Sequence, residues 1–161
     1  MIRPAHTSDL PLILEIMNDA ISNSTAIYEY APWSLEKITQ WYNERISYGF
    51  PIIVYEDGNK AVGYATFGSF RARVAYRFTI EHSVYVNKDF RAKGIGKLLL
   101  TDLISVAKTS GYRSMIGMVD ATNKRSVEFH KKLGFHKVGQ LKEVGHKFDV
   151  WLDVALLQCM L

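Results

Sequence analysis

From Ser83 to Gly96 a strand-like segment leads through a glycine-rich turn directly into a helical pattern. The first residues alternate β-branched and aromatic side chains, which is typical of a strand. The turn itself, Arg91-Ala92-Lys93-Gly94-Ile95-Gly96, is followed by leucines and a valine at helical spacing. The sequence therefore predicts a strand, a tight turn and a helix in immediate succession.

A glycine-rich turn that opens a helix is a natural seat for a phosphate group. The first N–H groups of a helix have no partner inside it, and the helix dipole adds positive charge there. Arg91, Lys93 and Lys97 surround the turn with cations. A Walker loop is excluded because Leu98 stands where that motif needs Ser or Thr, and Leu99 replaces the third small residue of a dinucleotide fingerprint. We interpret the turn as a phosphate or pyrophosphate site rather than an ordinary turn with solvated lysines.

The pattern Arg91-x-x-Gly94-x-Gly96 resembles the acyl-CoA pyrophosphate signature of the GNAT superfamily of N-acetyltransferases. Further segments match in order and spacing over nearly the whole chain: Ala75-Tyr76-Arg77, Glu81-His82-Ser83-Val84-Tyr85-Val86, Asn123, Ser126, His130, Gly134-Phe135, Val144-Gly145-His146-Lys147-Phe148 and Trp151-Leu152-Asp153-Val154. Together they resemble the phosphinothricin acetyltransferase branch, whose relatives acetylate methionine sulfone and methionine sulfoximine.

The resemblance implies an α/β (α+β) fold of the GNAT type, in a single domain covering residues 1–161. We expect a mixed, mostly antiparallel sheet of six to seven strands with helices on both faces. In this superfamily the two central parallel strands splay apart, and the thioester arm lies in the gap. The chain's own pattern agrees, because the strand predicted at 114–119 follows a helical crossover and should run parallel to the strand before the turn.

The remaining elements are predicted from local patterns. Residues 2–5 form a first strand, and Ser8 or Asp9 caps the helix that follows, while Ser34 caps a second helix. Residues 135–144 and 147–158 form a closing antiparallel pair, with Phe148 on the same face of the last strand as three aliphatic residues. The loop at 23–33 carries Tyr28 and two other aromatic residues. Either its aromatic side chains pack against the core, or the loop forms a wall of the acceptor pocket.

Composition excludes several classes of protein. The length of 161 residues suits one domain with a real core, and no apolar run approaches the roughly 20 residues of a membrane span. The N-terminus lacks the apolar core of a secretion signal, and the one cysteine, Cys159, fits a reducing compartment, so we expect a cytoplasmic protein. The net charge of +4 gathers at 71–77 and 88–97 without a nucleic-acid motif. We therefore expect a polyanionic cofactor, with no nucleic acid, membrane or metal ion.

Acetyl transfer to an amine requires a base that takes the amine proton. Glu81 is our candidate, directly or through one water, because burial in an apolar strand raises the pKa of a carboxyl group. The alternative is that Glu81 forms an ion pair with Arg73 or Arg77. Strand alternation places His82 on the opposite face from Glu81, so we interpret His82 as a packed histidine.

The resemblance also implies which residues bind acetyl-CoA. The backbone of Val84, Tyr85 and Val86 would stabilise the carbonyl oxygen if a bulge freed its N–H groups. Asn123, which could be only a helix cap, would bind the pantetheine arm. The expected cofactor-binding set is Val84, Tyr85, Val86, Arg91, Ala92, Lys93, Gly94, Ile95, Gly96, Lys97, Asn123, Ser126 and His130.

His130 stands where many superfamily members have a tyrosine that protonates the leaving thiolate. It could protonate the thiolate, contact CoA, or be a plain surface histidine. Some relatives have a further histidine on the closing strand, but this chain has Phe148 there. Glu81 therefore carries more of the mechanism, with His146 nearby on the same strand face if that strand extends so far.

The acceptor side is expected to use Tyr28, Arg73, Tyr76, Arg77 and Glu81. Arginine is suited to the acceptor carboxylate because its donors match two oxygens, although a solvated basic loop is the alternative. The expected function is N-acetylation of a small amino acid or analogue of the phosphinothricin, methionine sulfoximine or methionine sulfone type by acetyl-CoA. The alternatives are another amine (a polyamine, an aminoglycoside or a peptide N-terminus) and a non-catalytic acyl-CoA-binding module. Analogy with the family implies a homodimer.

Overall fold

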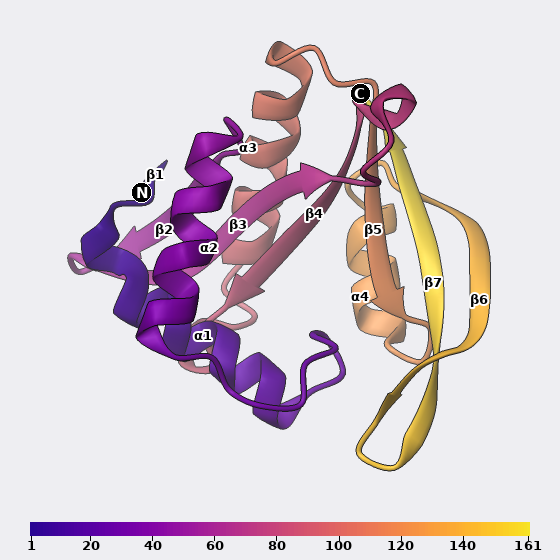
Figure 1. Cartoon of the computed structure of the whole chain (residues 1–161), viewed down its shortest axis with the longest axis horizontal. Helices are drawn as coiled ribbons and strands as arrows, with labels where there is room; N and C mark the ends of the chain where they lie inside the picture. The colour runs from indigo at the N-terminus through magenta and orange to yellow at the C-terminus, as the bar shows by residue number, and fades with distance from the viewer.

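The computed structural model describes residues 1–161, as one seven-stranded sheet with helices on both faces (Figure 1). The strands are β1 (Ile2–Pro4), β2 (Ile52–Asp57), β3 (Lys60–Ser69), β4 (Thr79–Val86), β5 (Ser114–Asp120), β6 (His136–Lys147) and β7 (Val150–Met160). The helices are α1 (Leu10–Asn23), α2 (Leu35–Ser47), α3 (Ile95–Thr109) and α4 (Lys124–Lys131). None of them is both long and apolar enough to cross a membrane.

The sheet has the order β1-β2-β3-β4-β5-β7-β6. All neighbouring pairs are antiparallel except β4 and β5, which confirms the predicted mixed sheet with one central parallel pair. These two strands pair only over Thr79–Glu81 and Ser114–Ile116. Beyond that point they diverge, and Figure 1 shows the widening gap between them. The expected splay is therefore present, and it divides the sheet into two halves.

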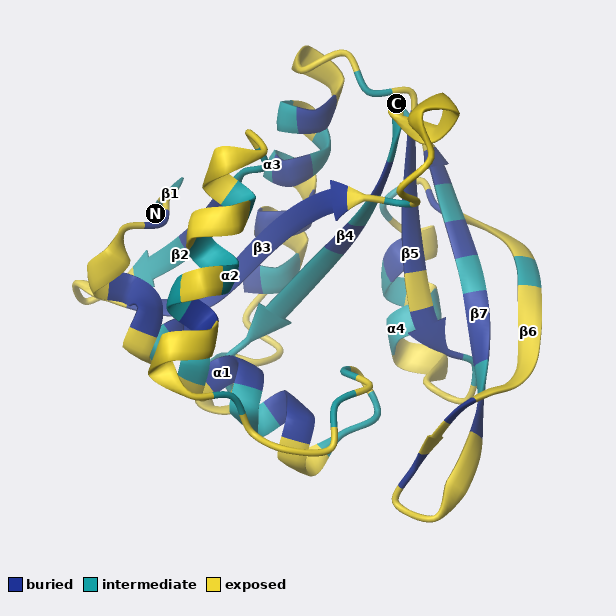
Figure 2. Cartoon of the chain, in the orientation of Figure 1, coloured by how far each residue is buried: buried dark blue, intermediate teal, exposed yellow.

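Each face of the sheet has its own buried cluster. Helices α1 and α2 cover one face, where Ile13, Ile38 and Tyr64 are fully buried. Helix α3 covers the other face with three buried leucines, including Leu103, and α4 packs beside it against β5, β6 and β7. Figure 2 shows this burial along the inner sides of the helices and through β3, β5 and β7.

Local capping chemistry matches the sequence at most points. The Ser34 hydroxyl accepts from the Lys37 N–H at 3.1 Å, as predicted for the start of α2. At α1 the prediction was wrong for the side chain of Asp9. Its carboxylate binds the Arg3 guanidinium and the His6 N–H, so it caps the short 3-10 helix Thr7–Asp9 and makes no capping bond to α1.

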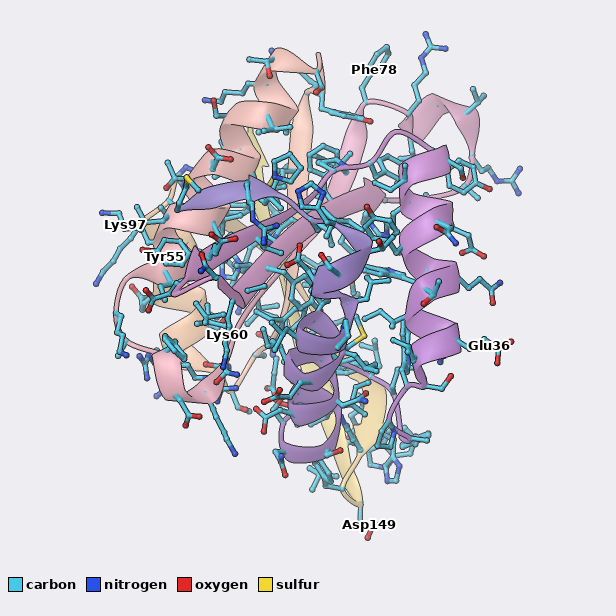
Figure 3. The ribbon with its side chains drawn as sticks, turned by 90° about the vertical axis from the view of Figure 1, so that its left-hand side faces the viewer. Glu36, Tyr55, Lys60, Phe78, Lys97 and Asp149 are labelled. Atoms are coloured by element: carbon cyan, nitrogen blue, oxygen red, sulfur yellow. The ribbon has the colours of Figure 1, made fainter.

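The closing hairpin differs from the expectation at its turn. Strand β6 continues to Lys147, and Phe148 and Asp149 form the turn with positive φ angles of 54° and 58°. Phe148 therefore does not lie on the last strand, and His146 belongs to β6, where it pairs with Trp151 of β7. Figure 3 shows Asp149 at the extreme tip of this hairpin, beyond the body of the fold.

Helix α3 offers a matched pair of substitutions that tests the packing of the core. Leu103→Ala should lower the free energy of unfolding by about 3 kcal/mol, because Leu103 is fully buried and leaves a cavity. Leu98→Ala, one helix face away and 48% exposed, should change it by less than about 0.5 kcal/mol. Urea denaturation of both variants measures the difference. Equal losses would contradict this assignment of the buried face.

Candidate active site

Two adjoining cavities open where β4 and β5 separate. The first, of about 360 Å³, lies between the loop after α1, strand β4 and strand β5. The second, of about 490 Å³, lies over the turn before α3. The cavities share six lining residues: Ala26, Val84, Tyr85, Asn123, Ser126 and His130. They therefore form one continuous channel from the glycine-rich turn to Glu81, which lines the first cavity.

The β3–β4 register identifies the backbone groups of β4 that face this channel. The ladder begins with the Phe70 N–H donating to the Thr79 carbonyl and ends with the Asn87 N–H donating to the Val62 carbonyl. Since donors alternate along a strand, Val84 and Val86 direct their N–H groups away from β3, into the gap. The expected bulge is absent from β4. Divergence of β5 frees these donors instead, and the N–H of Tyr85 points back into the ladder.

The turn before α3 is shaped for close approach of an anion. Gly94 has φ +82°, a left-handed conformation that glycine adopts without strain, and a side chain there would meet open space. Ala92 is also left-handed, at φ 64°. The N–H groups of the first turn of α3 are open to the second cavity, so the residues fit a pyrophosphate.

The cations around the turn hold different positions. Arg91 lines the cavity while donating to the Val86 carbonyl at 3.2 Å and pairing with Asp19 at 3.0 Å. Lys97 lines it too and extends into solvent (Figure 3). Lys93 instead lies over the Phe90 ring, 4.5 Å from its centroid, and is the one predicted cofactor residue outside the cavity lining.

Glu81 sits where the strands part, and burial raises the pKa of its carboxyl group. The positive charges of Arg71 and Arg45 partly oppose that rise. Arg45, on α2, fills the space over Gly68, because a methyl group at Gly68 would overlap its guanidinium. Gly68 pairs directly with Glu81, so the Arg45 guanidinium lies over the face of the sheet to which the Glu81 side chain points. One guanidinium nitrogen, Nη1, is buried without a hydrogen-bond partner.

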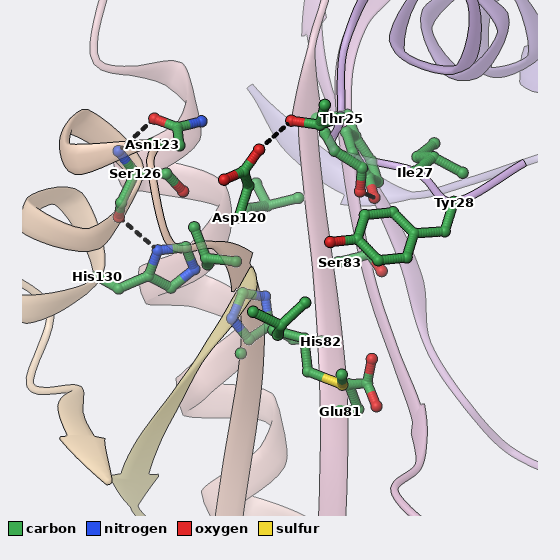
Figure 4. Close-up of a pocket in the computed structure, with 17 residues that line it drawn as sticks. Thr25, Ile27, Tyr28, Glu81, His82, Ser83, Asp120, Asn123, Ser126 and His130 are labelled. Atoms are coloured by element: carbon green, nitrogen blue, oxygen red, sulfur yellow. Dashed lines mark hydrogen bonds between the residues drawn. The ribbon is translucent and has the colours of Figure 1, made fainter. Parts of the chain in front are cut away.

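His82 and His130 pack against each other on the opposite face of β4, with ring centroids 5.0 Å apart (Figure 4). They are only 7% and 4% exposed, which confirms the packed His82 and excludes a surface position for His130. Gly117 makes room for both rings, since a methyl group there would lie 2.9 Å from Nε2 of His82. Both nitrogens of His82 and Nε2 of His130 have no partner.

Protonation follows from this burial. Desolvation, and secondarily the charge of His130, lowers the pKa of His82 to about 3, and desolvation also lowers the pKa of His130. Nδ1 of His130 lies 2.7 Å from the Ser126 carbonyl, which can only accept, so Nδ1 carries the proton. In the neutral ring Nε2 then carries a lone pair, and this atom is buried without a hydrogen-bond partner. His130 must gain a proton at Nε2 before it can donate one to a thiolate.

Hydrogen bonds from polar side chains stabilise the wall of the channel on the β5 side. The Asn123 side chain accepts from the Ser126 N–H at 3.0 Å, so it does cap α4, and its amide nitrogen remains free to donate. Asp120, at the end of β5, accepts from the hydroxyls of Thr25 at 2.5 Å and Thr122 at 2.7 Å (Figure 4). The Thr25 contact ties the loop after α1 to β5 across the gap.

The predicted acceptor residues divide into two groups. Tyr28 lines the first cavity together with Glu81. Arg73, Tyr76 and Arg77 line neither cavity, because the chain turns outward after β3 and leaves these side chains exposed. The alternative for Glu81, an ion pair with Arg73 or Arg77, is absent as well.

His146, which the sequence pattern placed near the site, is exposed on β6. Its ring packs on the Trp151 ring with centroids 4.8 Å apart. It lines neither cavity. Its place on the face of the last strand required that strand to extend back to residue 146, and β7 begins only at Val150.

Sequence reasoning missed several residues of the channel. Arg125 and Phe129 of α4 line the cofactor cavity, and Asp120 lines the acceptor cavity. Asp120 had a readable signal, because Asp-x-Thr after a strand is a common turn pattern. Arg45 had none, since its neighbour Glu81 is 36 residues away and only the packing of α2 on the sheet joins them.

The buried histidines predict how stability depends on pH. His82 has an ordinary pKa near 6.5 when unfolded and about 3 when folded, so the unfolded chain binds the extra proton below pH 6.5. Between pH 6.5 and 4.5 this one group should lower the free energy of unfolding by about 2.3 kcal/mol. His82→Gln should remove that part of the slope, as measured by urea denaturation at several pH values. An unchanged slope would contradict a neutral, buried His82.

Comparison with known proteins agrees with this geometry. Residues 14–135 match the model of the acetyltransferase (GNAT) family. The chain is 42% identical to an L-methionine sulfoximine/L-methionine sulfone acetyltransferase of Pseudomonas aeruginosa, over 98% of this chain and 92% of that protein. Its structure is similar to a ribosomal-protein-alanine N-acetyltransferase from Brucella melitensis (TM-score 0.99, 40% identity, covering 100% and 99% of the two chains). It is also similar to yncA from Salmonella typhimurium, solved with its cofactor acetyl-CoA (TM-score 0.97, 36% identity, 99% and 92% covered). The chain belongs to the acetyltransferase (GNAT) family.

Proposed function

We propose that this enzyme transfers the acetyl group of acetyl-CoA to the amino group of a small amino acid or analogue, of the methionine sulfoximine, methionine sulfone or phosphinothricin type. The observation that carries the proposal is the continuity of the channel from the pyrophosphate-shaped turn to a buried carboxyl group. The 42% identity to the Pseudomonas aeruginosa enzyme over nearly the full chain supports the acceptor class.

Acetyl-CoA would be held along the second cavity. The N-terminal turn of α3, from Gly94 to Lys97, would bind the pyrophosphate, with Arg91 and Arg125 adding positive charge. The free N–H groups of Val84 and Val86 and the amide of Asn123 would bind the arm that enters the splay. Donors fixed in this way would also stabilise negative charge that develops on the thioester oxygen, since they need no reorganisation.

Glu81 would act as the base for the acceptor amine. A carboxyl group whose pKa is raised by burial is a stronger base than an exposed one, and the charges of Arg71 and Arg45 limit that rise in pKa. Its place in the acceptor cavity beside Tyr28 puts it against a bound amine. The proton passes from the ammonium group to Glu81 and the neutral amine attacks.

His130 would accept the second proton that the amine loses and pass it to the leaving thiolate. The residue lines both cavities, and its buried Nε2 has no hydrogen-bond partner in the protein. Nε2 accepts a proton from the nitrogen that has just attacked, and then gives it to the departing thiolate sulfur. The ring begins and ends neutral, which agrees with its lowered pKa.

The acceptor carboxylate would be bound by an arginine near Glu81 rather than by the outward-facing pair at 73 and 77. Arg45 also lines neither cavity, but it is the candidate, because its charge acts on Glu81 and one of its nitrogens is buried without a partner. A peptide N-terminus is the second candidate acceptor, favoured by the similarity to the Brucella melitensis protein. A peptide has no carboxylate next to its amine, so the two candidates differ in their need for Arg45.

Two expectations of assembly and location belong to the proposal. The exposed apolar residues Phe148, Val150 and Trp151 of the β6–β7 hairpin offer a surface for a homodimer. The single buried cysteine fits a reducing compartment such as the cytoplasm. Sedimentation at micromolar concentration tests the first point, and a monomer alone would contradict it.

Gly94→Glu should abolish acetyl-CoA binding, because a carboxylate at the opening of α3 repels the pyrophosphate. Gly111→Glu is the matched control, since Gly111 ends the same helix with φ +81° and the same open surroundings. Both substitutions carry similar backbone strain, so only the position differs. Calorimetry should show acetyl-CoA affinity lost in the first variant and kept in the second. Equal affinities would contradict the assignment of this turn.

Glu81→Gln should lower kcat by about 10²–10⁴ and leave acetyl-CoA binding intact, if Glu81 is the base. The loss should shrink at high pH, where more of the acceptor is already neutral. Thiol release measured over a series of amines, with Glu128→Gln as a surface control, gives both the rate and the preferred acceptor. Near-normal kcat at neutral pH would assign the proton to His130 or to bulk water. Acetyl-CoA binding without turnover of any amine would favour a non-catalytic module.

A further inference from the structure

The loop that leaves α1 forms one wall of the acceptor cavity. Thr25, Ala26, Ile27 and Tyr28 all line that cavity, opposite Glu81. The loop has no regular secondary structure, so its shape depends on what holds its backbone. Lys147 of β6, near the other end of the chain, makes three hydrogen bonds to the backbone of this loop and of the end of α1.

The Lys147 ammonium group is completely satisfied by backbone oxygens. Nζ donates to the carbonyls of Ile21 at 2.6 Å, Ser24 at 2.8 Å and Ile27 at 2.7 Å. An ammonium group has three donors, and all three are used. The residue is 3% exposed and has no carboxylate partner.

This arrangement is a helix cap supplied by another part of the chain. The last four carbonyls of a helix have no partner within it, and the helix dipole makes that end negative. Ile21 lies in the last turn of α1, and Ser24 is the residue that follows Asn23. Lys147 therefore neutralises the end of α1 and fixes the direction in which the chain leaves it.

The same hairpin contacts the loop at two further points. The Tyr30 hydroxyl donates to the His146 carbonyl at 2.7 Å. A methyl group at Gly145 would overlap the Tyr28 ring, so this glycine lets the ring lie directly on the hairpin backbone. Residues 145–147 thus bind both the backbone of the loop and its cavity-lining tyrosine.

We propose that Lys147 is a positioning residue for the acceptor, which sets the shape of the cavity wall at Thr25–Tyr28 without touching the substrate. The proposal rests on the acceptor site described above. It predicts that loss of the ammonium group affects the acceptor more than acetyl-CoA, because Thr25, Ile27 and Tyr28 line the acceptor cavity but not the cofactor cavity. Ser24 and Ala26 also line the cofactor cavity, but Lys147 makes no hydrogen bond to the glycine-rich turn.

Lys147→Met keeps the length and the apolar stem but removes the charge and the donors. The acceptor KM should rise roughly tenfold, since small misplacements of a binding wall are costly, while acetyl-CoA affinity changes less than about twofold. Lys142→Met, an exposed lysine on the same strand, should leave both values unchanged. Lys147→Gln, which retains two donors without the charge, serves if the methionine variant fails to fold, and it should raise the acceptor KM in the same direction.

Amide hydrogen exchange gives a second readout that needs no substrate. Backbone amides at 22–28 should exchange faster in the Lys147 variants than in the unmutated protein, with α3 unchanged. If no amine is acetylated by the unmutated protein, the proposed function fails, and exchange still tests the role of Lys147. A folded variant with unchanged exchange at 22–28, or equal losses of acceptor and acetyl-CoA binding, would overturn the proposal.

Discussion

The site depends on one break in a hydrogen-bonded ladder, the separation of β4 from β5 after Glu81. Continued pairing would close the channel and use the N–H groups of Val84 and Val86 within the sheet. Separation leaves them without backbone partners, which is costly unless water or a ligand satisfies them. The two halves of the sheet remain joined where Thr79–Glu81 pairs with Ser114–Ile116, so the N–H donors of β4 are fixed in position before any ligand arrives. Such fixed donors stabilise developing charge better than mobile ones.

Burial at the point where β4 and β5 separate shifts the pKa values of Glu81, His82 and His130. The same low polarity raises the pKa of Glu81 and lowers the pKa of His82 and His130. It therefore makes the carboxylate a stronger base and keeps both imidazoles neutral. Arg45 limits the effect on Glu81, because a nearby cation favours the charged carboxylate. Burial therefore raises the pKa of Glu81, and the neighbouring arginines limit that rise.

The cofactor half of the site could be predicted from sequence, because its residues lie close together along the chain. Strand β4, the turn and the start of α3 are consecutive, and all but Lys93 of the predicted cofactor residues line the cavity. The acceptor half depends on contacts between distant segments. Arg73 and Arg77 are near Glu81 in sequence but turn outward, while Arg45 reaches it only through the packing of α2. Local patterns contain no information about that packing.

Lys147 illustrates why the acceptor half of the site is harder to predict from sequence than the cofactor half. As a sequence feature it is one lysine near a hairpin turn, yet it binds three carbonyls more than 100 residues away. A buried ammonium group is stable there only because the end of α1 supplies oxygens and a negative dipole. The acceptor wall is therefore attached to the outer hairpin of the sheet, and the cofactor turn is attached to α3. Changes in the hairpin can reshape the acceptor cavity without disturbing the phosphate site, so proteins with the same cofactor turn can select different amines.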